Sequence, residues 1–390
     1  AIARLAKRLG LPELRIGLVT GDDVSASINL NSLAVHEADT GLDMSSWKLV
    51  SANAYIGAAP LAEALAAGAQ IVVAGRTSDP ALAIAPLMHH FGWAEDDWQA
   101  LAVGAATGHL LECGSQVTGG VFWDPGFKDI PDPANIGFPI AEVGRDLSLL
   151  ITKPEDTGGI VDMRTIKEQL LYEVHDPACY ITPDVTLDIT GAHLSNHGRD
   201  RVAVHGLRGA RRPDLLKVTA CYEGSWLGEG EISVAGPNAL ARAKATADVL
   251  LERVKRRGLA RRARADLIGV ASVHDSDDGA LWRNYDGPAP QDIRIRLAVE
   301  ATTRDDADQA SREALALLCC GTAGTSGARW RVTPRGVGLN KRSPTTCWAG
   351  YSIGKVGPMT PPPHGLRPWR WLPTWLRRSP TWVCISKTKA

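Results

Sequence analysis

Short apolar runs alternate with helical patterns in the first half of the chain. Residues 14–20 and 70–74 have the length and apolar character of buried strands. Residues 1–9 and 60–67 follow a helical period, with a turn or a glycine at the end of each. This alternation predicts an α/β domain with a Rossmann-like parallel sheet. Because a strand in such a sheet has parallel neighbours, we expect at least one earlier strand to be missing before residue 1.

Helix signals place three further helices in this half. Asp79 is expected to cap a helix that begins at Pro80, whose missing N–H costs nothing at that position. The stretch after Trp93 predicts a long helix that breaks at Gly114. Asp162 is expected to cap an amphipathic helix.

The second half changes to short strands with two helices. The pattern predicts an α+β sandwich of split βαβ, ferredoxin-like type. We therefore expect an incomplete α/β domain over residues 1–182 and the sandwich over 183–325. The predicted strands cover 184–190, 201–207, 215–224, 266–272 and 292–302, and the predicted helices cover 238–257 and 305–318.

Residues 326–390 form a tail rich in proline, tryptophan and arginine, which is not expected to be a folded domain. No acidic residue follows Glu313, and six of the twelve tryptophans lie from Trp330 onward. Prolines interrupt every candidate helix there. One interpretation is a cationic segment at a membrane interface. We favour the other, a translated frameshift, because so abrupt a change in composition has no structural reason in a globular chain.

Composition narrows the classes of partner. Lys plus Arg and Asp plus Glu are both 43, so the net charge is zero and gives no support for a nucleic-acid or anionic-membrane partner. Seven cysteines without a CxxC pair indicate a reduced, cytoplasmic protein without a thiolate zinc site. No apolar run approaches the ~20 residues of a membrane span, and no leader pattern opens the chain.

Two strand-to-helix turns carry candidate anion ligands. Arg76 follows the strand over 70–74, at the edge where open α/β sheets bind ligands. The alternative for Arg76 is a surface ion pair with Asp79. Lys153 and Thr157 lie in a second such turn, but their spacing differs from that of a phosphate-binding loop.

The stretch HLLECGSQVTGG, residues 109–120, concentrates polar groups where the long helix ends. Glu112 in the last turn opposes the helix dipole, which indicates a compensating role as a general acid or base. Gly119 and Gly120 exceed what a helix stop needs, so their amides are candidates to stabilise an oxyanion, with close packing as the alternative.

Two weaker sites have structural alternatives that we favour. Cys113 shares a helix face with His109, which suits a nucleophile and its base, but a buried thiol without function is the more common case. VHDSDDG, residues 273–279, offers oxygen and nitrogen ligands, but its spacing matches no calcium loop, and we interpret it as a solvated turn. No metal ligand is assigned, and the cofactor is unknown.

Several long motifs resemble the acyclic terpene utilisation (AtuA-like) family. They are SANAYIGAAPLAEALAAGAQIVVAGRTSDPALAIAPL, HLLECGSQVTGG, NIGFPIAEV, ITKPEDTGGIV, KEQLLYEVHDPACYITPDV, LKVTACYEG and GEGEISVAG, in that order. The resemblance runs from about Leu14 to Gly324 and is lost at about Gly336. It implies bacterial catabolism of citronellol- or geraniol-type branched acids as acyl-CoA thioesters.

Within those motifs, the polar groups define a candidate site for a small-molecule substrate, with acyl-CoA as one form of it. The chemistry would be proton transfer beside a thioester carbonyl, as in an acyl-CoA lyase, hydratase or isomerase. The alternative is a non-catalytic binding subunit of an acyl-CoA-metabolising complex; assembly into a homo-oligomer is left open. The candidate catalytic residues are Glu112, His109 and Cys113, and the candidate binding residues are Asn53, Tyr55, Arg76, Asp79, Gly119, Gly120, Lys153, Thr157, Gly158 and Tyr172.

Overall fold

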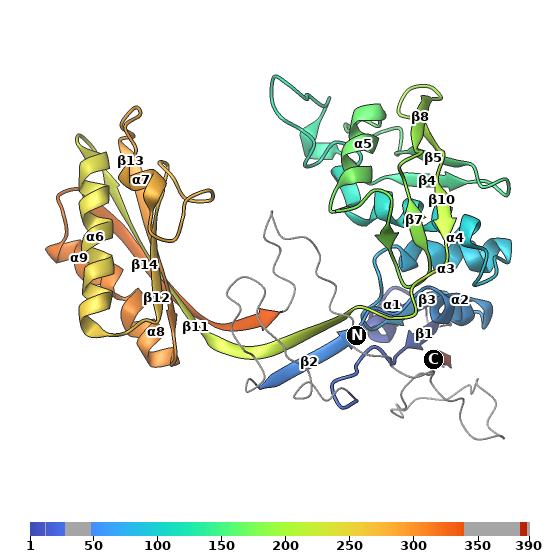
Figure 1. The fold of residues 1–390 in the computed structure, drawn as a ribbon, viewed down its shortest axis with the longest axis horizontal. Coiled ribbons are helices and arrows are strands. Elements are labelled where there is room, and N and C mark those ends of the chain that lie inside the picture. The colour runs from blue at the N-terminus through green and yellow to red at the C-terminus, as the bar shows by residue number, and fades with distance from the viewer. Residues whose placement is uncertain (12, 28–47, 339–382, 388–390) are drawn as a thin grey trace. The chain divides into compact units, whose positions relative to one another are not determined.

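The chain forms two compact units, seen in the computed structural model, which describes residues 1–11, 13–27, 48–338 and 383–387 (Figure 1). Of the described residues, the first unit comprises 1–11, 13–27, 51–220 and 383–387, and the second comprises 48–50 and 221–338. The sequence pattern places a boundary at residue 183, but residues 183–220 belong to the first unit by their contacts. The reason is that their strands pair with, or pack on, elements that precede residue 183.

The first unit contains parallel and antiparallel pairings. β1 runs parallel to β3 and antiparallel to β15, whereas two further sheets, β4-β5-β9-β8 and β10-β7-β6, are antiparallel. The described part of the first unit therefore contains one parallel pair, β1–β3, beside antiparallel strands. The strands are β1 (Arg15–Val19), β3 (Ile71–Ala74), β4 (Ile140–Val143), β5 (Leu149–Thr152), β6 (Tyr180–Ile181), β7 (Thr186–Asp188), β8 (His193–Asn196), β9 (Val202–His205), β10 (Arg208–Ala210) and β15 (Val383–Lys387); β2 (Leu49–Ala54) pairs with β11.

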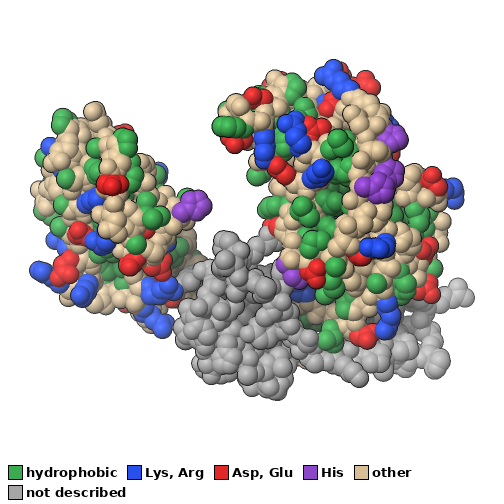
Figure 2. Space-filling view, turned by 45° about the horizontal axis from the view of Figure 1, so that its top comes forward, with side chains coloured by type: hydrophobic (Ala, Val, Ile, Leu, Met, Phe, Trp, Pro, Cys, Tyr) green, Lys and Arg blue, Asp and Glu red, His purple; other side chains and the backbone are tan. Residues whose placement is uncertain are grey.

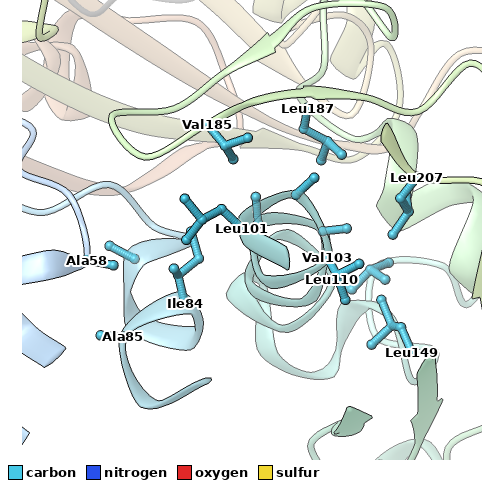
Figure 3. Packing of buried hydrophobic residues seen from close by; sticks show 14 of the residues in the cluster. Ala58, Ile84, Ala85, Leu101, Val103, Leu110, Leu149, Val185, Leu187 and Leu207 are labelled. Carbon is cyan, nitrogen blue, oxygen red and sulfur yellow. The ribbon is translucent and has the colours of Figure 1, made fainter. Parts of the chain in front are cut away.

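Helix α4 (Trp98–Glu112) runs through the core of the first unit (Figure 3). Every residue from Ala100 to Leu110 is buried, so this helix packs on all sides, as expected of a helix without a polar face. The side chain of Asp97 caps its first turn by accepting the N–H of Ala100. Its neighbours include α3 and the strands β7 and β10. The other helices are α1 (Ile2–Arg8), α2 (Ala59–Ala66), α3 (Ala81–Phe91) and α5 (Met163–Leu171).

The second unit is an antiparallel sheet in the order β12-β13-β11-β14, with helices packed on it. The buried residues of β13 alternate along the strand and face a core that is separate from that of the first unit. Helix α6 connects β11 to β12, which lie on either side of β13. The elements are β11 (Val218–Ala235), α6 (Ala239–Arg257), β12 (Arg262–Ile268), α7 (Ala280–Arg283), β13 (Asp292–Ala301), α8 (Arg304–Ser311), α9 (Glu313–Cys320) and β14 (Thr325–Gly338).

The other face of this sheet carries a network of ion pairs. Asp266 is fully buried and accepts hydrogen bonds from Arg264 and Arg296. Glu231 on β11 is paired with Arg294 from β13 and with Arg329 from β14. Acidic and basic side chains also alternate on the visible surface of the molecule (Figure 2). The charges are therefore balanced within the sheet rather than gathered into a field of one sign.

Part of the predicted tail is a strand. Residues 326–338 fall within β14, which pairs with β11, and residues 383–387 form β15 beside β1. The sequence pattern missed β14 because its pairing partner lies about a hundred residues away. The rest of the tail, with most of its prolines and tryptophans, lies outside the described residues.

Asp184 lies between β6 and β7 in the sequence, and its buried carboxyl group contacts the backbone at the start of α2. Its Oδ1 accepts a hydrogen bond from the N–H of Ala58 at 2.7 Å, and its Oδ2 has no partner among the described residues. Burial raises the pKa of Asp184 from 3.8 to about 6, against the lowering effects of the Ala58 N–H and of the charge on Arg212. The folded state therefore favours the protonated form of Asp184.

Stability should depend on pH through this group. Because the folded-state pKa of Asp184 is raised, protonated Asp184 makes its full contribution to the free energy of unfolding below about pH 4. This contribution is lost as the pH rises through about 6. Asp184→Asn stays neutral, so its free energy of unfolding relative to the wild type should rise by up to about 3 kcal/mol between about pH 4 and pH 7. Urea unfolding at both pH values measures this.

Asp188→Asn on β7 is the control for this prediction. Hydrogen bonds from the side chain and backbone of Thr190 lower the pKa of Asp188, so its replacement should show the opposite trend with pH. A difference between Asp184→Asn and the wild type that stayed constant with pH would contradict the assignment to Asp184.

Candidate functional site

The carboxyl ends of β1 and β3 meet the end of β2 around Asp22. Asp22 Oδ2 accepts hydrogen bonds from Asn53 Nδ2 at 2.9 Å and from the N–H of Arg76 at 2.7 Å. A Cβ on Gly75 would lie 1.8 Å from Asp22, so only glycine fits beside this carboxylate. Asp22 thus fixes the turn that presents the Arg76 side chain.

Tyr55 stands directly after β2 and receives two donors on its phenol oxygen. Arg76 Nη2 donates to Tyr55 Oη at 2.7 Å, and Thr219 Oγ1 donates at 3.1 Å. Arg76 Cζ lies 4.2 Å and Lys217 Nζ lies 4.6 Å from the centre of the Tyr55 ring. Burial opposes ionisation of Tyr55, but the two hydrogen bonds and the two cations outweigh it and lower the pKa.

His109 lies in the last turns of α4 and is almost fully buried. Gln169 Nε2 donates to the His109 carbonyl at 3.0 Å, and the His109 ring packs on Tyr180 with 5.1 Å between ring centres. Burial lowers the pKa of His109, so the imidazole is neutral at neutral pH. Its Nε2 has no hydrogen-bond partner among the described residues. A buried polar atom of this kind is uncommon and often marks a ligand or catalytic position.

Cys113 and Glu112 end the helix together. Cys113 Sγ donates to Glu112 Oε2 at 2.7 Å. Burial and the neighbouring Glu112 raise the pKa of Cys113 to about 11, so the group is a thiol rather than a thiolate at neutral pH. This geometry gives the nucleophile interpretation of Cys113 no support. Glu112 is exposed.

These residues form one cluster through their charges. Glu112 acts electrostatically on Arg76, and Asp79 Oδ1 lies 4.0 Å from Arg76 Nη1. Both carboxylates also act on His109, Cys113 and Tyr180. The cluster therefore combines two exposed carboxylates, an exposed guanidinium and a buried neutral imidazole at one edge of the β1–β3 sheet.

The family model of the acyclic terpene utilisation family protein AtuA matches residues 1–340. The chain belongs to the acyclic terpene utilisation family. Membership implies a role in acyclic terpene utilisation. The match ends at residue 340, and the sequence motifs that resemble the family extend to about Gly336. No curated protein and no solved structure matches this chain.

Three members of the cluster were missed by sequence reasoning. Gln169, Tyr180 and Lys217 all lie inside motifs that resemble the acyclic terpene utilisation family, but each comes from a different part of the chain. Their types and spacing alone carry no signal for a site. The family motifs were the signal that could have found them.

Asp79 does not cap α3, contrary to the sequence prediction. The N-cap residue is Pro80, and no side chain accepts an N–H there. Asp79 instead faces Arg76, which is the ion pair weighed as the alternative for that arginine. The carboxylate is thus available to the cluster rather than used by the helix.

The glycine amides predicted to form an oxyanion site are already engaged. The N–H of Gly119 donates to Gln116 O at 3.1 Å, and that of Gly120 donates to Ser115 O at 2.7 Å. They close the turn after α4, so the packing interpretation fits these glycines. An oxyanion formed in this site would need another donor.

The second strand-to-helix turn has a local structural role. Lys153 is buried, donates to the carbonyl of Thr157 at 2.8 Å and lies 3.5 Å from Asp200. A Cβ on Gly158 would collide with the backbone of Asp132, so Gly158 permits close packing. Lys153, Thr157 and Gly158 therefore stabilise the loop that follows β5. Tyr172, the residue after α5, is 40% exposed.

Metal and membrane features are not found in the described part of the chain. No group of three or more His, Cys, Asp or Glu residues within it could hold a metal ion. The helices within the same ranges are all too short or too polar to cross a membrane.

Proposed function

We propose that this member of the acyclic terpene utilisation family is an enzyme that acts on branched acyl-CoA thioesters by acid–base chemistry. The observation that supports it is the position of Glu112, an exposed carboxylate beside the buried neutral His109, whose Nε2 has no hydrogen-bond partner within the described ranges. Buried groups with shifted pKa values concentrate at functional sites. Membership of the acyclic terpene utilisation family supports a terpene-derived substrate, and the acyl-CoA thioester is part of the proposal.

In the proposed reaction, Glu112 removes a proton from the carbon next to the thioester carbonyl. Cys113 holds one carboxylate oxygen by its hydrogen bond and so orients the other. Arg76, whose side chain is 46% exposed, binds a carboxylate or phosphate group of the substrate. His109 offers its neutral imidazole to the substrate, because its Nε2 has no hydrogen-bond partner among the described residues.

We also propose that the second unit is a split βαβ sandwich of ferredoxin-like type. Its support is the order β12-β13-β11-β14, in which α6 joins two strands that flank a third. For the first unit, the β1–β3 pair with α2 between them in sequence supports a Rossmann-like half.

Glu112→Gln tests the proposed enzyme. We expect it to lower kcat for a branched acyl-CoA by about 10²–10⁴-fold with little change in KM, because a general base contributes that much to a rate. Glu155→Gln, an exposed glutamate in the loop after β5, is the matched control and should leave kcat unchanged. Cys113→Ser should retain activity within a few-fold. Turnover is measured by mass spectrometry of the thioester.

A different outcome would identify a binding subunit. If the wild type were stabilised against heat by a branched acyl-CoA but never changed its mass, the enzyme proposal would be wrong. Equal activity of Glu112→Gln and the wild type would reject the role of Glu112 while keeping the enzyme.

A further inference from the structure

The phenol of Tyr55 is held in a way that a purely structural tyrosine does not need. Tyr55 is 7% exposed, and one hydrogen bond would satisfy a buried hydroxyl. Its oxygen instead accepts hydrogen bonds from both Arg76 and Thr219. Both contacts withdraw electron density from the oxygen and stabilise a negative charge on it.

Two cations face the same ring. Arg76 and Lys217 come from different elements, one after β3 and the other just before β11, and both lie within 5 Å of the ring centre. Lys217 is held by the backbone as well, since its carbonyl accepts the N–H of Tyr55 at 2.9 Å. Burial lowers the pKa of Lys217, with opposing contributions from Tyr55 and Asp79. The two hydrogen bonds and the two cations therefore stabilise the ionised form of Tyr55 once its proton has been transferred to an acceptor.

Tyr55 is linked to the proposed base through the side chain of Arg76. Arg76 contacts the Tyr55 oxygen with one nitrogen, lies 4.0 Å from Asp79 with the other, and is affected by the charge of Glu112. One side chain therefore separates the phenol from the two carboxylates. The amides of Gly119 and Gly120, which were expected to donate to an oxyanion, close a turn instead.

We propose that Tyr55 is the general acid of this site and that Lys217 and Arg76 are positioning residues that stabilise its ionised form. This proposal rests on the proposed function. As Glu112 takes the proton from the α-carbon, the electron pair of the C–H bond forms a double bond to the carbonyl carbon, and the π electron pair of the carbonyl moves to its oxygen. That oxygen takes the phenolic proton of Tyr55, whose O–H bond breaks and leaves a phenolate beside two cations. With a β,γ-unsaturated thioester, Glu112 then gives its proton to the γ-carbon and the enol returns its proton to Tyr55, which completes a double-bond isomerisation with no other reactant.

Titration of the tyrosines tests the proposal without any substrate. The chain has 6 tyrosines, and burial raises the pKa of Tyr180 and Tyr222. The ultraviolet difference absorbance of tyrosinate should therefore show one step clearly below the usual value of about 10. Tyr55→Phe should remove this step, and Tyr285→Phe in the second unit should leave it unchanged.

Lys217→Met and Arg76→Met separate the electrostatic cause from a structural one. Each variant keeps the phenol but removes a positive charge, so the low step should move to higher pH by about one unit or more. Circular dichroism checks that each variant is folded. A single titration near the usual value for the wild type, or a low step that survives Tyr55→Phe, would overturn the proposal.

Kinetics then connect Tyr55 to turnover. With a branched acyl-CoA that the wild type converts, Tyr55→Phe should lower kcat by about 10²-fold or more, and Lys217→Met should shift the alkaline limb of the kcat profile to higher pH. Full activity of Tyr55→Phe would overturn the role of Tyr55 and leave Glu112 in place. If no thioester is converted, the proposed function fails and Tyr55 is not its acid, even where the low step is present.

Discussion

Trp282→Ala should destabilise the second unit by about 3–5 kcal/mol, the usual cost of removing a buried aromatic side chain. Trp282 lies in α7 with 1% of its surface exposed and is among the largest fully buried side chains of the described residues. Its Nε1 donates to the carbonyl of Ala265 on β12 at 3.0 Å, so the substitution also leaves a buried carbonyl without this partner. Urea unfolding followed by circular dichroism measures the loss.

The location of the effect is part of the prediction. Trp282 belongs to the core of the second unit, whereas α4 belongs to the separate core of the first. Hydrogen exchange should therefore accelerate in β12 and β13 while α4 stays protected. Leu281→Ala, at a neighbouring position that is 52% exposed, should cost less than about 1 kcal/mol. Equal losses for the two variants would show that Trp282 is not a core residue.

Gly108→Ala should disturb both the stability of the first unit and the candidate site. A Cβ at Gly108 would lie 2.5 Å from Pro80 Cα and 2.7 Å from Pro80 O. These are backbone atoms at the start of α3, so α3 and α4 would have to separate. We expect a loss of about 1–3 kcal/mol or more from overpacking. His109 and Glu112 would also shift away from Asp79, and turnover should fall by about 10-fold or more.

Gly104→Ala is a matched control on the same helix, one turn earlier. A Cβ there would meet the side chains of Ile84 and Trp93 at 3.1 and 3.3 Å. Side chains can move by a few tenths of an ångström, and alanine favours the helix by about 1 kcal/mol relative to glycine. Gly104→Ala should therefore be close to neutral. Similar melting temperatures for the two variants would mean that the contact of Gly108 with Pro80 is not tight.

Local signals explain why several helices could be predicted from the sequence. Asp162 caps α5 through the N–H groups of Arg164 and Thr165, and Gly258 ends α6 in a left-handed conformation. Both signals act within a few residues of the helix end. Pro80 shows the limit, because a proline can begin a helix with or without a capping side chain before it.

Pairings between distant segments could not be predicted in the same way. β14 and β11 pair across about a hundred residues, and β1 pairs with β15 near the other end of the chain. A strand pattern gives the faces of a strand but not its partner. The extent of the first unit to residue 220 was missed for this reason.

The residues of the candidate site also differ in whether the sequence alone could group them. His109, Glu112 and the C-cap residue Cys113 lie within about one turn at the end of α4, so their grouping follows from the helical period. Tyr180 and Lys217 join them through tertiary contacts only. Gly119 and Gly120 after α4 fit either close packing or ligand binding when only the sequence is considered. Their backbone hydrogen bonds in the structure favour packing.

The burial of α4 on every side has an evolutionary consequence. Nearly any enlargement between Ala100 and Leu110 meets packed neighbours, so drift in that stretch should be slow and limited to small residues. Its carboxyl end is different, since Glu112 is exposed and the following turn is held by its own backbone. Sequence divergence around the candidate site should therefore arise in the turns that surround α4, whose own sequence should change little.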